Sequence, residues 1–233
     1  MSYTFPNRPI YAPYIGPCGC TRKESFHKMR TTDFQKYHEF VLGTAIFQPN
    51  RGITYCVTKL AGEIGEVNDK LSKVIADNLS GDVSDEVFGR RLSDRQAIVL
   101  ELGDVTWYVA ALANELGSSI VVLRKAYAFD PVSTPDGHEI IGGGLRLSAL
   151  VGNILETTGK FIRDKGGDGT NTSFLADQPY TNTVLTYLSA ILDRVDLLAA
   201  KFGHEITDVL EANVKKLTDR RERGTLRGSG DNR

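Results

Sequence analysis

The 233-residue sequence predicts an all-α fold, an antiparallel bundle of amphipathic helices, from three observations. Apolar residues recur at helical spacing along several long segments, and almost no segment alternates apolar and polar residues as a half-buried strand does. Clusters of proline and glycine separate these segments. Two of the segments also carry the same pair of carboxylates on the same flank of their apolar stripe, at residues 60–67 and 98–105.

The first helix is expected to begin at the polar run Thr31–Asp33, which can cap it, and to end before Pro49, because the residue preceding a proline disfavours helix. Farther along, Leu116–Ser119 contains a glycine typical of a helix end followed by a serine typical of a new helix start. The expected helices cover residues 31–47, 53–76, 94–116, 119–128, 145–164, 182–202 and 205–223.

The clusters of proline and glycine divide the chain into four regions. Residues 1–30 are expected to form an extended arm, because four of the eight prolines lie there and each one disrupts a helix interior. Residues 129–144, rich in proline and glycine, are expected to link a first half at 31–128 to a second half at 145–233. We also expect an insertion at 77–92 and a polar loop after the glycines at 166 and 167.

The two carboxylate pairs are Glu63 with Glu66 and Glu101 with Asp104, each spaced i, i+3 on its helix. A shift of 38 positions superposes both the pairs and the apolar stripes. If the two helices pack stripe to stripe and run antiparallel, equal flanks face the same side and the four carboxylates converge. A single pair is more typical of a solvated helix flank, whereas two pairs in equivalent phase favour a cation site. Oxygen ligands of this kind suit Mg²⁺, with Mn²⁺ as the other candidate.

These acidic motifs resemble the ExxE…ExxD signature of the MazG-like, all-α nucleoside triphosphate pyrophosphatases. The resemblance spans roughly residues 31–127 and 182–233 and is carried by Tyr55, Leu60–Val67, Glu101–Tyr108, Asn213–Gly224 and Gly228–Arg233. One departure is the 34-residue separation, 67–100, between the two motifs, which is longer than in most members and alters the mouth of the site.

The resemblance implies a helical bundle of MazG-like type and Mg²⁺-dependent hydrolysis of nucleoside or deoxynucleoside triphosphates to monophosphate and pyrophosphate. It assigns all four carboxylates as metal ligands and catalytic residues, with Glu63 preferred for orienting the attacking water. The residues expected to contact substrate are Lys70, Tyr108, Asn213, Lys216 and Arg220. Two of these have simpler explanations, since Lys70 can pair with Glu66 at i, i+4 and Tyr108 can be a half-buried interface aromatic. Trp107 points away from the acidic flank and is expected to pack in the core or a subunit interface.

The second half is weakly similar to the first, which suggests an internal duplication. Aligning Gly62 with Gly152 places Asn153 at Glu63 and Glu156 at Glu66. On the next helix, tyrosine and alanine replace the two acids, at positions 187 and 190. The chain is therefore expected to be a covalent pseudo-dimer with one active site, and the remaining apolar helix faces favour a homodimer of chains.

The composition favours an intracellular, cytoplasmic protein. The net charge of −1 provides no overall field that would attract a nucleic acid polymer or a membrane surface. Three cysteines cannot form a disulfide framework, and no apolar signal region follows Met1. Cys18 and Cys20, with His27 nearby, do not favour a zinc site, because a structural zinc normally has four ligands and no second cluster occurs.

Three other functions remain open at this point, one within the same chemistry and two from other classes. A dUTP-selective diphosphatase would use the same four carboxylates and differ only in its base pocket. A helical module could instead bind nucleotides or a partner without turnover, or the bundle could be purely structural. The intact set of four acids in the first half favours the enzyme.

Overall fold

The computed structural model describes residues 31–77, 92–126 and 139–225, and every regular element in these ranges is an α-helix. The helices are α1 (Thr31–Thr44), α2 (Gly52–Asp77), α4 (Leu92–Glu115), α5 (Ile120–Ala126), α6 (Glu139–Lys165), α7 (Asn171–Leu175), α8 (Gln178–Lys201) and α9 (Ile206–Glu222). Within the described ranges no strand occurs, so the predicted all-α class is confirmed.

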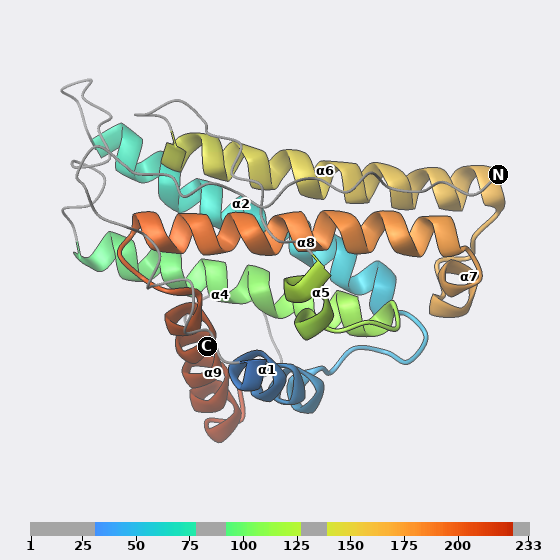
Figure 1. Cartoon of the computed structure of the whole chain (residues 1–233), viewed down its shortest axis with the longest axis horizontal. Helices are drawn as coiled ribbons and strands as arrows, with labels where there is room; N and C mark the ends of the chain where they lie inside the picture. The colour runs from blue at the N-terminus through green and yellow to red at the C-terminus, as the bar shows by residue number, and fades with distance from the viewer. Residues whose placement is uncertain (1–30, 78–91, 127–138, 226–233) are drawn as a thin grey trace, which may run out of the picture.

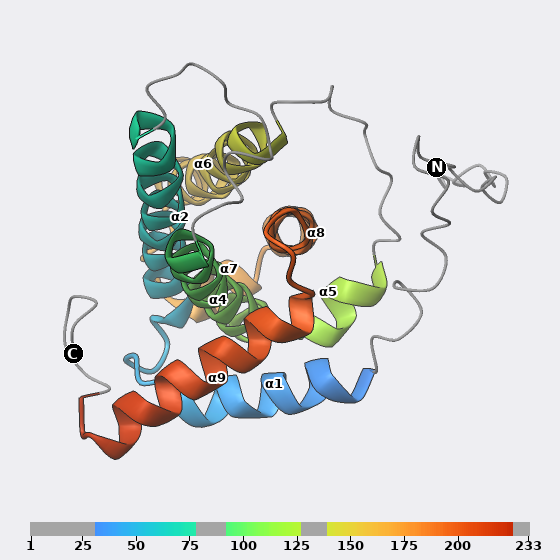
Figure 2. The same ribbon diagram turned by 90° about the vertical axis from the view of Figure 1, so that its left-hand side faces the viewer.

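The four long helices α2, α4, α6 and α8 form a bundle in which each packs against two of the others (Figure 1). Neighbouring helices run in opposite directions. Gly52 at the start of α2 lies beside Glu115 at the end of α4, and Gly143 near the start of α6 lies beside Leu198 near the end of α8. The shorter helices α1, α5 and α9 cover the side of the bundle that α4 and α8 form (Figure 2).

One continuous apolar core runs through the bundle and joins both halves of the chain. The predicted stripes supply it, because the apolar positions of each long helix repeat every three or four residues and so share one face. Its fully buried members include Leu60, Ile64, Leu102, Leu112, Leu147, Ile154, Leu188 and Ile191. The stripe of α4 lies at the centre, which fixes the flank on which its acids lie.

Helix α6 begins at Glu139, six residues before the expected start, so part of the expected linker 129–144 is helical. Its glycines are points of close approach between helices. A Cβ atom on Gly143 would lie 2.6 Å from Cδ2 of Leu198, and one on Gly144 would lie 2.5 Å from Oδ1 of Asn68. The glycines therefore let α6 approach both α8 and α2. Local sequence does not distinguish glycines that serve such close packing from glycines of a flexible linker.

The expected polar loop, which runs to about Tyr180, contains the short helix α7 and the first turn of α8. Asp177 caps α8, where its side chain accepts a hydrogen bond from the backbone N–H of Tyr180 at 2.8 Å. Phe174 of α7 is fully buried and contacts the rings of Tyr180 and Phe161. Local sequence favours a loop here, because α7 is only five residues long, too short to show an apolar stripe, and Phe174 is its buried residue.

The two halves end their second long helix with the same turn. Gly117 after α4 and Gly203 after α8 are both left-handed, with φ of 75° and 81°. The N–H of each glycine donates a hydrogen bond to the carbonyl oxygen three residues earlier. The N–H of the residue after each glycine donates to the carbonyl oxygen five residues before itself, as in a Schellman motif. The internal duplication itself stays a prediction.

Several expectations lie outside the described residues. They are the extended arm at 1–30 with its two cysteines, most of the insertion at 77–92, the linker portion before 139, and the tail after 225. In the described part, one segment of α4, Gln96–Glu115, is long and apolar enough to cross a membrane by length and composition alone. Most of that segment is buried inside the protein, and core helices of soluble proteins meet the same criteria.

Two alanine substitutions in α6 are expected to change stability in opposite directions. Gly142→Ala places its Cβ in open space and should raise the free energy of unfolding by about 0.5–1 kcal/mol, because alanine is a better helix former than glycine. Gly143→Ala meets the buried Leu198 and should lower it by about 1–2 kcal/mol. Urea denaturation of both variants measures the difference, and equal gains would contradict the close packing of α6 on α8.

Candidate metal centre

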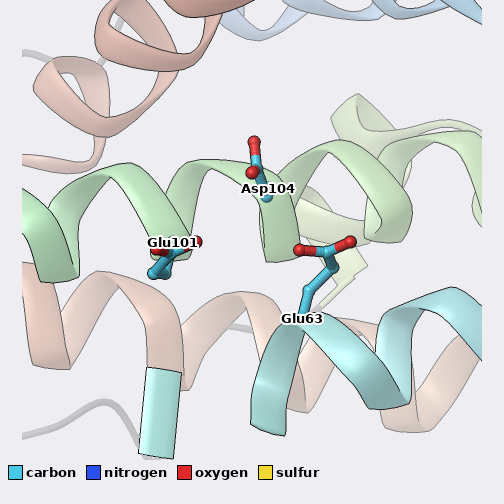
Figure 3. Close-up of side chains that lie close together, drawn as sticks. All are labelled: Glu63, Glu101 and Asp104. Atoms are coloured by element: carbon cyan, nitrogen blue, oxygen red, sulfur yellow. The ribbon is translucent and has the colours of Figure 1, made fainter. Parts of the chain in front are cut away.

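The antiparallel hairpin of α2 and α4 brings three carboxylates together beside the core. One oxygen each from Glu63, Glu101 and Asp104 lies within 4.8 Å of the others. Figure 3 shows Glu63 extending from α2 toward α4, on which Glu101 and Asp104 lie one turn apart. Glu63 and Glu101 are buried and Asp104 is half-buried. The phase of the two stripes predicts that carboxylates on their equal flanks converge if the helices run antiparallel. The structure has this antiparallel arrangement.

Glu66, the fourth predicted ligand, lies one turn farther along α2 and is exposed. It is not a member of the group of oxygens within 4.8 Å. Its negative charge still helps to raise the pKa of Glu63, so it lies close enough to influence the site. The structure thus brings together three of the four predicted ligands, with Glu66 at the edge.

A lysine lies near each of the three clustered carboxylates. The distances are 3.6 Å from Lys59 Nζ to Glu63 Oε1, 3.6 Å from Lys70 Nζ to Glu101 Oε1, and 2.5 Å from Lys216 Nζ to Asp104 Oδ2. Lys70 was expected to meet phosphate or Glu66, and the structure places it across the hairpin at Glu101. The protein therefore supplies three positive charges of its own to this acidic cluster.

Helix α9 reaches the site through two of its predicted residues. Asn213 is fully buried, and its Nδ2 donates a hydrogen bond to Asp104 Oδ1 at 2.9 Å. Its Oδ1 accepts a hydrogen bond from the buried hydroxyl of Tyr37 in α1, also at 2.9 Å. Lys216 holds the other oxygen of Asp104. Arg220, one turn later on α9, is also buried.

The absence of a side chain at Gly103 lets α9 lie close to α4. A Cβ atom there would lie 2.9 Å from Cβ of Asn213 and 3.4 Å from the carbonyl oxygen of Val209. These atoms belong to or adjoin the backbone of α9, so they cannot move aside without shifting the helix. Gly103 therefore sets the distance from which Asn213 reaches Asp104.

Gly103→Ala is expected to lower the free energy of unfolding by about 1–2 kcal/mol, because α9 must move away from α4. The matched control is Gly65→Ala on the exposed side of α2, where a Cβ meets nothing within 4 Å and should be stabilising. Chemical denaturation compares the two variants. A gain in stability for Gly103→Ala would contradict the close approach of the two helices.

Glu63 is an acid of the cluster whose pKa is strongly perturbed. Its pKa is raised to about 7, chiefly by burial and then by the charges of Asp104 and Glu66. Glu101 adds to this effect, and Lys59 opposes it. Charge compensation by the lysines is thus incomplete at Glu63, which can take up or release a proton near neutral pH.

An aromatic wall borders the cluster on the Glu63 side. Tyr108 is half-buried one turn after Asp104, and burial together with Tyr55 raises its pKa above the usual range. The Tyr55 and Tyr108 ring centroids are 6.3 Å apart, and Phe47 lies 5.5 Å from Tyr55. Tyr55 is 42% exposed. Tyr108 is the member of this wall that lies near Glu63, whose charge contributes to its raised pKa, and Tyr55 is the partly exposed ring beyond it.

Trp107 packs in the core, as its phase on α4 predicted. It is buried, and its Nε1 donates a hydrogen bond to Oγ1 of Thr44 in α1 at 3.0 Å. The positions of the second half that align with the acids are arranged differently. Asn153 and Glu156 are exposed on α6, and Glu156 pairs with Lys160 at 2.6 Å.

Two residues of the site were missed in the sequence. Lys59 precedes Glu63 by four positions, a helical spacing that predicts an ion pair, so a signal was present. Tyr37 carried none, because its contact with Asn213 joins residues 176 positions apart.

Comparison with known proteins identifies no family for this chain. No family model and no solved structure matches it. The chain is similar to the Gene 37 protein of Mycobacterium phage L5, with 40% identity over 65 residues. That match covers 28% of this chain, and the chain spans half the length of this curated relative.

Proposed function

We propose that this protein is a Mg²⁺-dependent hydrolase that converts nucleoside or deoxynucleoside triphosphates to monophosphates and pyrophosphate. The observation that carries the proposal is the convergence of Glu63, Glu101 and Asp104 on an antiparallel hairpin. Hard divalent cations prefer carboxylate oxygens, and acids this close repel one another without a cation. The resemblance of the two acidic motifs to MazG-like enzymes supplies the reaction class.

The donor set suits Mg²⁺. Three carboxylates offer oxygen ligands from two rigid helices, and Glu66 can join from the next turn. Mg²⁺ usually binds proteins through a few carboxylates and keeps waters that substrate phosphates replace. When bound, the metal would neutralise charge on the triphosphate and lower the pKa of a coordinated water.

The chain's own residues would do the remaining work. Glu63, as an ionised carboxylate at the cluster, would orient the attacking water and accept its proton. Lys70 and Lys216 place ammonium groups at the cluster, where phosphate oxygens would lie. Tyr55, exposed at the end of the aromatic wall, offers a surface on which a nucleobase can stack. Arg220 remains a predicted phosphate contact.

A second candidate is a helical module without turnover. It is favoured by the three lysines, because a carboxylate cluster with its own counter-ions can hold helices together with no metal. In that case Asp104 would serve to attach α9 to α4 through Asn213 and Lys216. The two candidates differ in whether a divalent cation and a nucleotide bind.

A hydrolysis assay tests the proposal. The full chain is incubated with each common ribo- and deoxynucleoside triphosphate and with dUTP, in Mg²⁺ or Mn²⁺, and products are separated by anion-exchange chromatography. We expect monophosphate and pyrophosphate in equal amounts, and no reaction after chelation. Turnover of dUTP alone would identify the diphosphatase alternative. No product from any nucleotide would favour the module without turnover.

A further inference from the structure

Both oxygens of Asp104 are held by side chains of α9, and the two contacts differ in charge. Asn213, a neutral donor, bonds Oδ1 at 2.9 Å. Lys216, a cation, lies 2.5 Å from Oδ2 with only 16% of its side chain exposed. Tyr37 bonds the amide oxygen of Asn213, which fixes the direction in which the amide N–H groups point. The same carboxylate thus has one positioning contact and one compensating charge.

The two contacts have opposite consequences for a metal ion. A divalent cation bonded to Oδ2 would take the position next to that oxygen and repel the ammonium of Lys216. The contact of Asn213 involves the other oxygen and adds no positive charge. It would therefore remain, and it would keep the carboxylate oriented toward the cluster, as outer hydrogen bonds do for metal ligands in general.

We infer that Lys216 is a resident counter-ion, which holds the cation position on Asp104 Oδ2 and is displaced when a metal binds, and that Asn213, fixed by Tyr37, is a positioning residue for Asp104. This inference rests on the proposed function. Once displaced, the ammonium remains on α9 at the rim of the site, where the phosphates that accompany the metal give it a new anionic partner. Metal and polyphosphate therefore bind cooperatively. The metal frees the ammonium of Lys216 to pair with the phosphates, and the phosphates stabilise the ammonium that the metal has displaced.

The test is a titration of the full chain with Mn²⁺ in the absence of nucleotide. The electron paramagnetic resonance signal of free Mn²⁺ measures how much of the ion has bound. Lys216→Met keeps the aliphatic bulk and removes the competing charge, so it should bind Mn²⁺ about tenfold more tightly than wild type. Asn213→Ala should bind about tenfold more weakly, as expected for loss of an outer hydrogen bond. Lys215→Met, an exposed neighbour on the same helix, is the matched control and should leave affinity unchanged.

The outcomes separate the inference from the proposed function. Wild-type binding with an unchanged or weaker affinity in Lys216→Met overturns the inference and leaves the metal site standing. Failure of all four proteins to bind Mn²⁺ contradicts the metal site itself. Thermal unfolding keeps the test decisive if Lys216→Met is less stable without metal. Mn²⁺ should then raise its melting temperature more than that of wild type, and an equal rise would count against displacement.

Discussion

Replacing Glu63 by glutamine is expected to lower nucleotide hydrolysis about a thousandfold, the effect of losing a metal ligand and proton acceptor together. Glutamine has nearly the same shape and removes only the charge, so the packing between α2 and α4 should be preserved. The measurement is the rate of pyrophosphate release at saturating Mg²⁺ and nucleotide. Circular dichroism should show an unchanged helical content.

The matched control for this variant is Glu156→Gln. Glu156 aligns with Glu66 in the second half of the chain, and it lies exposed on α6 in an i, i+4 pair with Lys160. Exposed pairs of this kind contribute little to stability, so wild-type activity is expected. Equal losses in both variants would indicate a global defect, and full activity in Glu63→Gln would remove Glu63 from the mechanism.

The convergence of the acids could be predicted because it depends only on helical phase. Glu63 and Glu101 occupy the same position relative to their apolar stripes, and packing stripe to stripe in antiparallel orientation is enough to bring equal flanks together. The phase argument is less accurate along the helix axis. It treated Glu66 as equivalent to Asp104, whereas the structure leaves Glu66 exposed at the edge of the cluster.

The remaining features depend on contacts between distant segments. Gly143 looked like part of a linker, and only the position of Leu198 explains why a helix would use a glycine there. The pairing of Lys70 with Glu101 depends on the register of the hairpin, which local spacing does not determine. The bond from Tyr37 to Asn213 required the docking of α1 on α9, for which the sequence carried no signal.

The stability of the metal-free protein is expected to fall as the pH rises, by about 3 kcal/mol through Glu63 alone. The ordinary pKa of a glutamate is 4.5, and that of Glu63 in the folded protein is about 7. Between these values the folded state binds more protons than the unfolded state, so each increase in pH favours unfolding. The loss begins near the lower value and is complete above the higher one. Urea denaturation across this range measures it.

Glu63→Gln isolates this contribution, because other buried acids change stability in the same direction. Asp193, for example, has its pKa raised to about 6, mainly by burial. The stability difference between wild type and Glu63→Gln should therefore grow in favour of the variant from about pH 4.5 to 8. A flat difference would show that Glu63 titrates normally.

The pH dependence of stability can also be measured with Mg²⁺ present, to test whether the cluster binds a cation. A bound cation favours the ionised form of Glu63, so saturating Mg²⁺ should remove the destabilisation above pH 7 in wild type and have a smaller effect on Glu63→Gln. If the lysines alone compensate the cluster, Mg²⁺ leaves both profiles unchanged. Repulsion among the acids that Lys59 does not fully offset is the driving force that a metal site would use. The same measurement therefore separates a centre that binds a cation from a network that only holds helices together.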